Sequence, residues 1–568
     1  MNQDWSIRAI DDSLAERLAS EAGLSSVAAG LLLSRGVRSA EDARRFLSPE
    51  LSDIPDPFSL PGMEAAAARI AAAVKGGERI AVFGDYDADG VTSTAILARF
   101  LSEVGAAPLT ALPSRFGEGY GLTAQAVDDL KAGGATLIIT VDNGTKAFEA
   151  IDHARSAGVD VVVTDHHETE GALPRAAAVV NPKREGSPAE LANLCGAGVA
   201  FMTALAVRKL LREMELLPSP EPNLRRHLDL VAIGAIADSV ELTGANRIFA
   251  KHGIAEISRS GKPGIRALMA VAGSDPAKLT PGAVAFGLAP RINAAGRLSD
   301  ASRALTLLLS EDPEESAKIA GELDAANRRR QEVEEKIVSE AMAMLENDRD
   351  LPSRSAIVLS SEGWHIGVVG IVAAKIAQRF SRPAVVITRD AMPARGSARS
   401  FTGINVVEAL ASCGELLVKF GGHMMAAGLS IDARSIEPFA ARFDEECARR
   451  SAEAGPARLV VDAEVSPGEI TEELVSELAK LGPFGPGNPE PVLMLRSARV
   501  SGARIVGNGH LKLTAKCGGL SFDAIGFGMA DSLPPGDSEV SLAFLPEINT
   551  WQGFSSVQLK LCALKPLS

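Results

Sequence analysis

Short apolar segments alternate with helix-like segments between residues 79 and 165, and this alternation limits the possible folds more than any other feature. Four segments are rich in β-branched and apolar residues: RIAVFGD (79–85), APLTAL (107–112), TLIITVD (136–142) and VDVVVTD (159–165). The segments between them have the apolar spacing of helices about 10–15 residues long. Nearly continuous apolar strands separated by helices are typical of a parallel sheet covered on both faces. The sequence therefore predicts an α/β domain, completed by a later apolar helix over 227–238.

Composition excludes several classes of protein. With 568 residues, 46% hydrophobic and 23% charged, the chain is long enough for three or four globular domains. The net charge of −14 means that any binding of nucleic acid depends on local basic patches. The five cysteines form no CxxC pair, which argues against a disulfide scaffold and a zinc ribbon and fits a reducing compartment. We find no signal peptide and no apolar run of about 18 residues, so we expect a cytoplasmic protein that is not bound to a membrane.

The pattern divides the chain into five parts. We expect an N-terminal helical segment (1–75), the parallel-sheet domain (76–314), one long amphipathic helix (315–350), a smaller α/β domain (351–455) and a tail of short strands (456–568). The long helix could bridge two domains or could equally be an ordinary surface helix. The tail has about five or six short strands, which is typical of a small barrel or sandwich.

The segment GDYDADG carries three carboxylates directly after the first predicted strand. Asp85, Asp87 and Asp89 fall where an open parallel sheet has its ligand crevice. Because carboxylates held this close repel one another, a divalent cation such as Mg²⁺ or Mn²⁺ is the natural partner. An EF-hand-like calcium loop would need a glutamate where the chain has Ile96. On this segment alone, an acidic turn facing solvent remains an equally good explanation.

Two further strands end in similar groups. Asp142 follows the third strand, and Asp165, His166 and His167 follow the fourth. Asp238 ends the apolar helix, where a carboxylate opposes the helix dipole and a metal would compensate it. Imidazole beside carboxylates suits Mn²⁺. Together these groups could hold two metal ions about 3.5–4 Å apart, an arrangement that suits phosphoryl transfer.

The smaller α/β domain contributes positive charge. Between His365 and Gly403 the chain has six basic residues and one acidic residue, a net charge of +5. The RGSARS segment (395–400) offers guanidinium and hydroxyl groups to phosphate oxygens, and GGH (421–423) lets the backbone approach a phosphate closely. Either motif alone could be a surface arginine or a glycine turn. The residues that we expect to contact phosphate in these motifs are Ser397, Arg399, Ser400, Gly422 and His423.

The tail is basic as well, with five basic residues and one acidic residue between 491 and 530. A barrel of the OB type with such a face binds single strands through backbone charge and base stacking. Phe522, Phe527 and Trp551 are candidates for stacking, although packing in a core is the commoner role of such residues.

These motifs carry a family resemblance. GDYDADG, VDNG, TDHH and GAIAD, in this order, resemble the motifs of the DHH phosphoesterase superfamily. RINAAGR (291–297), RGSARS and GGH are similar to motifs of the RecJ family within it, which consists of single-strand-specific DNA exonucleases. The resemblance extends from about residue 20 to the C-terminus. It implies a DHH catalytic domain at 76–314, a DHH-associated domain at 351–455 and an OB-like domain at 456–568, joined by the long helix.

The resemblance also implies a role for each candidate residue. The implied metal ligands are Asp87, Asp89, Asp142, His166 and Asp238. Asp142 would bridge the two ions, His167 would lie beside the scissile phosphate, and Asp85 would lie beside the ligands or bind a metal partially. The implied contacts to the substrate are Arg115, Tyr120, Arg291, Asn293, Arg297, Ser397, Arg399, Ser400, Gly422 and His423.

The implied function is an exonuclease that degrades single-stranded DNA from the 5′ end to mononucleotides in repair and recombination, with two Mn²⁺ or Mg²⁺ ions activating water. The resemblance alone gives this polarity. A narrow cleft between the two α/β domains would admit one strand. A single-strand-binding protein and a helicase would be partners, and the enzyme would be a monomer without membrane contact. Two alternatives remain, a small-molecule phosphoesterase of the same superfamily and a non-catalytic replisome scaffold. The OB-like tail argues against the first, and the complete acidic and histidine set argues against the second.

Overall fold

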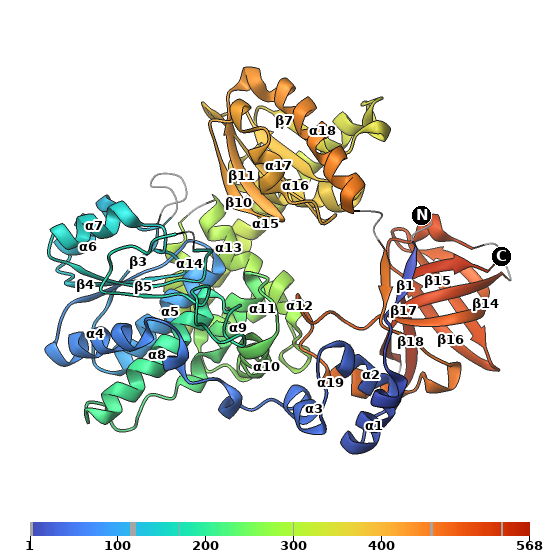
Figure 1. The fold of residues 1–568 in the computed structure, drawn as a ribbon, viewed down its shortest axis with the longest axis horizontal. Coiled ribbons are helices and arrows are strands. Elements are labelled where there is room, and N and C mark those ends of the chain that lie inside the picture. Colours follow the sequence, from blue (N-terminus) through green and yellow to red (C-terminus); the bar gives the residue numbers. More distant parts are fainter. Residues whose placement is uncertain are drawn as a thin grey trace. The chain divides into compact units, whose positions relative to one another are not determined.

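The computed structural model describes residues 4–113, 121–169, 171–298, 300–454, 458–534, 538–551 and 553–567. The chain forms two compact units, drawn in Figure 1. The first comprises Met1–Ala289, Leu308–Glu311 and Arg458–Ser568, and the second comprises Pro290–Leu307 and Asp312–Ala457. None of the helices in the described part of the chain combines the length and apolar character that a bilayer span requires.

The first unit contains the predicted parallel sheet. Its strands are β2 (Ile80–Phe83), β3 (Leu109–Ala111), β4 (Leu137–Val141), β5 (Asp160–Thr164) and β6 (Ala178–Val180). They are parallel and lie in the order β3-β2-β4-β5-β6, so the four predicted strands are confirmed and β6 is an addition. The chain crosses from one side of β2 to the other between β3 and β4. This reversal opens a crevice at the carboxyl ends of β2 and β4.

Helices cover both faces of this sheet (Figure 1). The helices around it are α4 (Met63–Gly76), α5 (Ala88–Glu103), α6 (Ala124–Ala132), α7 (Phe148–Ser156), α8 (Gly196–Glu213), α9 (Leu228–Ala237), α10 (Gly244–Arg259) and α11 (Pro263–Ala272). One face packs on α6 and α7 through residues such as Phe83 and Val163. On the other face lie α4, α5 and α8. Residues 228–236 of α9 are all buried, as expected for a helix that is apolar all round.

The C-terminal part of the first unit is a closed five-stranded barrel, so the barrel rather than the sandwich is the correct prediction. Its strands are β14 (Leu493–Val506), β15 (His510–Cys517), β16 (Leu520–Gly526), β17 (Glu539–Trp551) and β18 (Phe554–Pro566). The pairing runs β14-β15-β16-β18-β17 and closes between β17 and β14. The short strand β13 (Ala463–Glu464) adds to β14. Phe522 is buried in the barrel core, where it cannot stack on a base.

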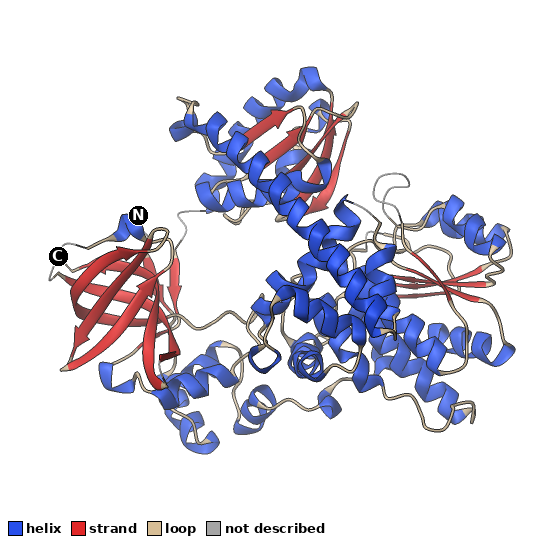
Figure 2. Ribbon diagram, turned by 180° about the vertical axis from the view of Figure 1, so that it is seen from behind, coloured by secondary structure: helices blue, strands red, loops and turns tan. Residues whose placement is uncertain are grey.

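The N-terminal helices divide between two cores. The helices α1 (Asp12–Ala22), α2 (Ser26–Ser34) and α3 (Ala40–Leu47) share the hydrophobic core of the barrel with α19 (Glu472–Lys480). Figure 2 shows them at one end of the barrel. The strand β1 (Trp5–Ile7) pairs in parallel with β12 (Leu459–Val461). By contrast, α4 packs on α8 and β6. The segment expected as one helical part therefore supports both the barrel and the parallel sheet.

The second unit contains the smaller α/β domain and the long helix, together with residues Pro290–Leu307. Its sheet has the order β10-β11-β9-β8-β7, with only β7 and β8 parallel. The strands are β7 (Ile357–Ser361), β8 (Ala384–Thr388), β9 (Ala394–Arg399), β10 (Lys419–His423) and β11 (Ala426–Ile431). The helices α15 (Pro313–Glu346), α16 (Ile366–Phe380), α17 (Val406–Ala411) and α18 (Ile436–Ala454) accompany them. The short helices α12 (Pro281–Ala283), α13 (Ala289–Leu298) and α14 (Ser302–Leu309) precede α15. The C-terminal half of α15 packs its apolar residues on α16.

Candidate metal centre

The DxDxDG segment forms a tight turn from β2 into α5. Asp85 accepts a hydrogen bond from the backbone N–H of Tyr86 at 2.7 Å, and Asp87 caps α5 by accepting from the N–H of Gly90 at 3.0 Å. A Cβ at Gly90 would lie 2.5 Å from the Asp85 nitrogen, so only glycine fits there. Asp85 and Asp89 are each 2% exposed, which excludes the alternative of an acidic turn facing solvent.

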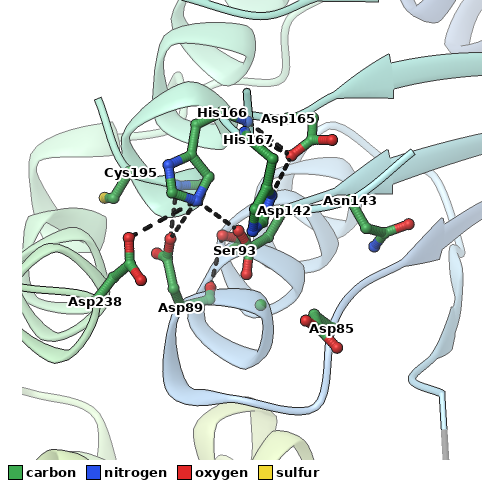
Figure 3. Close-up of polar contacts among 12 residues, drawn as sticks. Asp85, Asp89, Ser93, Asp142, Asn143, Asp165, His166, His167, Cys195 and Asp238 are labelled. Atoms are coloured by element: carbon green, nitrogen blue, oxygen red, sulfur yellow. Dashed lines mark hydrogen bonds and ion pairs between the residues drawn. The ribbon is translucent and has the colours of Figure 1, made fainter. Parts of the chain in front are cut away.

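Asp142 and His166 meet Asp89 from the ends of the neighbouring strands. Asp142 is 2% exposed and has a backbone φ of 62°, a conformation that residues other than glycine rarely adopt. His166 Nε2 lies 2.9 Å from Asp142 Oδ1. The same nitrogen lies 3.7 Å from Asp89 Oδ2 and 3.7 Å from Asp238 Oδ2 (Figure 3). Asp238 reaches this point from the C-cap of α9.

Three groups of side chains place their ligand atoms within 4.8 Å of one another. These are Asp142 with His166 and His167, Asp89 with His166 and Asp238, and Asp85 with Asp87 and Asp142. Asp142 and His166 each belong to two groups, so neighbouring sites can share ligands. Carboxylate oxygens with imidazole nitrogen are a donor set that Mn²⁺ accepts readily and that Mg²⁺ can use through its carboxylates. The residues therefore fit a centre of adjacent divalent cations.

The electrostatics of these carboxylates favour a cation. Burial raises the pKa of Asp142 well above its usual range, and the charges of Asp89, Asp87 and Asp85 raise it further. Burial and the charge of Asp87 raise the pKa of Asp89 to about 7, although backbone N–H groups oppose the shift. A divalent ion would offset the repulsion that causes these shifts.

His167 is held by Asp165. His167 Nδ1 lies 2.7 Å from Asp165 Oδ1, and Asp165 Oδ2 accepts from the backbone N–H of Thr145 at 2.9 Å. Burial opposes the charged form of His167, but the hydrogen bond and the charge of Asp165 outweigh it and raise the pKa of His167 to about 9. Burial likewise opposes ionisation of Asp165, and its bond to His167 nevertheless holds the Asp165 pKa well below the usual range. Sequence reasoning noted Asp165 but missed this anchoring contact, which its place directly before two histidines could have indicated.

In the second unit, two predicted phosphate contacts lie at one end of the sheet. Arg399 of β9 pairs in register with Ala426 of β11, and Ala426 pairs with His423 of β10. Because residues paired in register point to the same face, Arg399 and His423 flank Ala426 on one face. Gly422 of β10 has φ 149°, and a Cβ there would lie 2.4 Å from the Ala426 oxygen, so this position requires glycine.

Other predicted contacts are less open. Ser397 lies on β9 two residues before Arg399, and Ser400 is only 1% exposed. Arg291 Nη2 lies 2.8 Å from Asp324 Oδ1, an ion pair between α13 and α15.

Arg297 Nη1 donates to the Gly367 carbonyl at 2.9 Å, and Asn293 is half-buried on α13. Arg297 therefore joins α13 to the start of α16. Arg115 and Tyr120 lie outside the described residues.

The barrel presents cations on neighbouring strands. Arg499 lies opposite Lys516, and Arg504 lies opposite Lys512, in the pairing of β14 with β15. Arg499 also lies opposite Glu539 of β17, which offsets its charge, so the like-charge argument applies to Arg504 with Lys512. Like charges directly opposite one another destabilise a sheet, and a bound polyanion would reduce this cost. Phe527 is 55% exposed beside these strands and could stack on a base.

Comparisons with known proteins agree with this geometry. The family model described as "DHH family, N-terminal domain" matches residues 79–235, the DHHA1 domain matches 353–449, and the RecJ OB domain matches 461–563. The single-stranded-DNA-specific exonuclease RecJ of Escherichia coli K12 is 40% identical over 564 residues, which are 94% of this chain and 95% of that protein. This chain belongs to the RecJ family.

Further RecJ proteins agree. RecJ of Bacillus subtilis 168 is 38% identical over 566 residues, which are 98% of this chain and 70% of that protein. The crystal structure of Thermus thermophilus RecJ in complex with Mn²⁺ has a TM-score of 0.85 and 33% identity, covering 100% of this chain and 80% of that one. A structure of the same protein with Mg²⁺ has a TM-score of 0.79, so RecJ proteins of this fold have been solved with both cations.

Proposed function

We propose that this chain is a metal-dependent exonuclease that degrades single-stranded DNA from the 5′ end to mononucleotides in DNA repair and recombination. The observation that carries this proposal is the convergence of carboxylates and two histidines at the ends of β2, β4 and β5. Relatives along nearly the whole chain, named single-stranded-DNA-specific exonucleases, support the same activity.

The proposed roles follow from the position of each side chain. Asp87, Asp89, Asp142, His166 and Asp238 hold two Mn²⁺ or Mg²⁺ ions, with Asp85 beside them. When bound, the ions supply a water molecule of lowered pKa and offset the charge that develops on the phosphate. His167, kept charged and oriented by Asp165, donates a hydrogen bond to a phosphate oxygen. The mechanism requires no serine, cysteine or lysine nucleophile.

The proposed substrate contacts form two sets. Arg399, Ser400, Gly422 and His423 bind phosphate at the end of the second unit's sheet, together with Ser397. The cations of β14 and β15 bind the backbone of a longer strand, which suits a polyanion. For Arg115, Tyr120, Arg291, Asn293 and Arg297, contact with the nucleotide is the prediction of the family motifs.

The wider setting is proposed from the family resemblance. The enzyme acts in the cytoplasm as a monomer, with a single-strand-binding protein and a helicase as partners. The division of the chain into five parts, with boundaries after residues 75, 314, 350 and 455, is likewise a proposal.

A digestion assay with 5′-labelled and 3′-labelled single strands tests this function. We expect release of labelled mononucleotide from the 5′ end only with Mn²⁺ or Mg²⁺, and no cleavage by Asp142→Ala. A matched control is Asp152→Ala, an exposed position on α7 that should keep wild-type turnover. Cleavage of dinucleotides but not long strands would favour a small-molecule phosphoesterase, and binding without cleavage would favour a scaffold. Near-normal turnover by Asp142→Ala would show that its assignment is wrong.

A further inference from the structure

Helix α8 begins directly against the carboxylate of Asp89. The backbone N–H of Gly196 donates to Asp89 Oδ2 at 2.6 Å, and that of Ala197 donates to Asp89 Oδ1 at 2.9 Å. These are the first two residues of a helix of 18 residues. Asp89 also lies in the first turn of its own helix, α5. The buried carboxylate therefore lies at the positive ends of two helix dipoles.

Cys195 completes this contact as the N-cap of α8. Its Sγ accepts from the backbone N–H of Gly198 at 3.2 Å, which is the contact of an N-cap side chain. Cys195 is fully buried, and Figure 3 draws it with the carboxylates of the centre. An aspartate cap, a common choice at this position, would instead add another negative charge to the cluster.

Two glycines let the helices approach this closely. A Cβ at Gly196 would lie 2.6 Å from the Cβ of Asp142. A Cβ at Gly234 of α9 would lie 2.5 Å from Asp89 Oδ1 and 2.7 Å from the Cβ of Ala197. Any larger residue would therefore displace a carboxylate of the centre.

We propose that Cys195, Gly196 and Ala197 are positioning residues that hold the Asp89 carboxylate in one orientation for the metal, with Gly234 leaving the space it needs. This inference rests on the proposed function, because it concerns the same centre. Each carboxylate oxygen can accept more than one bond, so both oxygens of Asp89 keep acceptor capacity after binding an amide. Without these donors, repulsion from the neighbouring carboxylates would turn Asp89 away. The N-terminus of α8 thus sets the ligand in place before the ion arrives.

Titration of the full chain with Mn²⁺ by isothermal calorimetry, without DNA, tests the proposal. Cys195→Ala removes the N-cap contact to Gly198 that holds the first turn of α8, and Gly234→Ala inserts a methyl group against Asp89 Oδ1. We expect both to weaken Mn²⁺ binding about 10- to 100-fold, the range found when groups that orient metal ligands are removed. Cys195→Ser, which retains an N-cap acceptor for the Gly198 N–H, should restore most of the affinity. The control is Gly321→Ala on α15, where a Cβ meets nothing within 4 Å.

A second readout separates positioning from folding. The Mn²⁺ concentration that gives half the maximal exonuclease rate should rise in Cys195→Ala, and most of the lost rate should return at saturating Mn²⁺. A purely structural role would lower the melting temperature in EDTA without changing this concentration. If Gly234→Ala does not fold, the comparison of Cys195→Ala with Cys195→Ser still decides. Wild-type affinity in Cys195→Ala and in a folded Gly234→Ala would overturn the inference, whereas absence of Mn²⁺ binding in the wild type would overturn the proposed function itself.

Discussion

Replacing Asp142 with asparagine should stabilise the metal-free protein while abolishing its exonuclease activity. Ligand atoms of Asp85, Asp87 and Asp142 lie within 4.8 Å of one another. At that separation two unit charges repel by about 3 kcal/mol if the effective dielectric constant is about 20. This repulsion, together with burial, raises the pKa of Asp142, so folding of the metal-free protein must either bury the charge or take up a proton. Asparagine avoids both costs and tolerates the positive φ of this position better than most residues do.

Part of this gain is lost, because His166 Nε2 lies 2.9 Å from Asp142 Oδ1 and would lose this carboxyl partner. We therefore expect a net stabilisation of about 1–2 kcal/mol. For a domain of 150–250 residues, this raises the melting temperature by about 2–8 °C.

Thermal unfolding in EDTA and in Mn²⁺ measures both effects. In EDTA, Asp142→Asn should melt above the wild type. Mn²⁺ at a concentration 100 times its Kd should stabilise the wild type by about 2.7 kcal/mol and so raise its melting temperature. The same Mn²⁺ concentration should raise the melting temperature of the variant much less. Asp152→Asn, an exposed charge removal on α7, should change neither value.

Two results would refute this reasoning. If Asp142→Asn melts below the wild type in EDTA, the contact of Asp142 with His166 outweighs the repulsion among the carboxylates. If Mn²⁺ stabilises both proteins equally, Asp142 does not bind the metal.

Three further predictions concern the groups around the centre. Asp165→Asn should lower kcat about 10- to 100-fold, because His167 loses the partner that orients it. Calorimetry should show little change in Mn²⁺ affinity, and a matching loss of affinity would contradict a role confined to His167. Arg399→Ala should weaken binding of a labelled single strand in EDTA about 10-fold by fluorescence anisotropy, and unchanged binding would remove it from the substrate contacts. Arg504→Glu combined with Lys512→Glu should weaken binding of long strands more than of short oligomers, and equal losses would show that the barrel does not follow the strand.

The strands of the central sheet could be predicted because their composition is nearly uniform. Residues 137–141 and 161–164 are entirely buried, so apolar and β-branched side chains fill each strand without interruption. The fifth strand, β6 (Ala178–Val180), lies in the run AAAVV at 176–180, and alanine is depleted in strands, so this run does not have the β-branched pattern of the other strands. Its place was therefore missed, although it is as buried as its neighbours.

The partners of the N-terminal helices could not be predicted. Apolar periodicity shows that a helix has a buried face, but it does not show which element covers that face. The core shared by α1, α2 and α3 joins residues from the first tenth of the chain to the barrel near its end. The parallel pairing of β1 with β12 is equally remote in sequence, with Trp5 opposite Leu459.

The metal ligands could be inferred because their residue types are distinctive and each follows a strand or ends a helix. The topology explains this success, since parallel strands bring their carboxyl ends to one edge. The groups that hold the ligands were harder to find. Gly196 and Ala197 act through backbone N–H groups, which every residue except proline has, so no side-chain type marks them.

The position of the metal centre in the fold explains both its ability to bind cations and the stability that the metal-free protein loses there. The strand order reverses beside β2, so the ends of β2 and β4 form an edge where loops can converge. Asp85, Asp89 and Asp142 are nearly inaccessible there, and burying several carboxylates close together is unfavourable. The N-termini of α5 and α8 offset part of this cost at Asp89 through fixed dipoles. The remaining repulsion is the free energy that a divalent cation relieves when it binds. For this reason, variants that relax the carboxylate cluster should gain stability without metal and lose the ability to bind it.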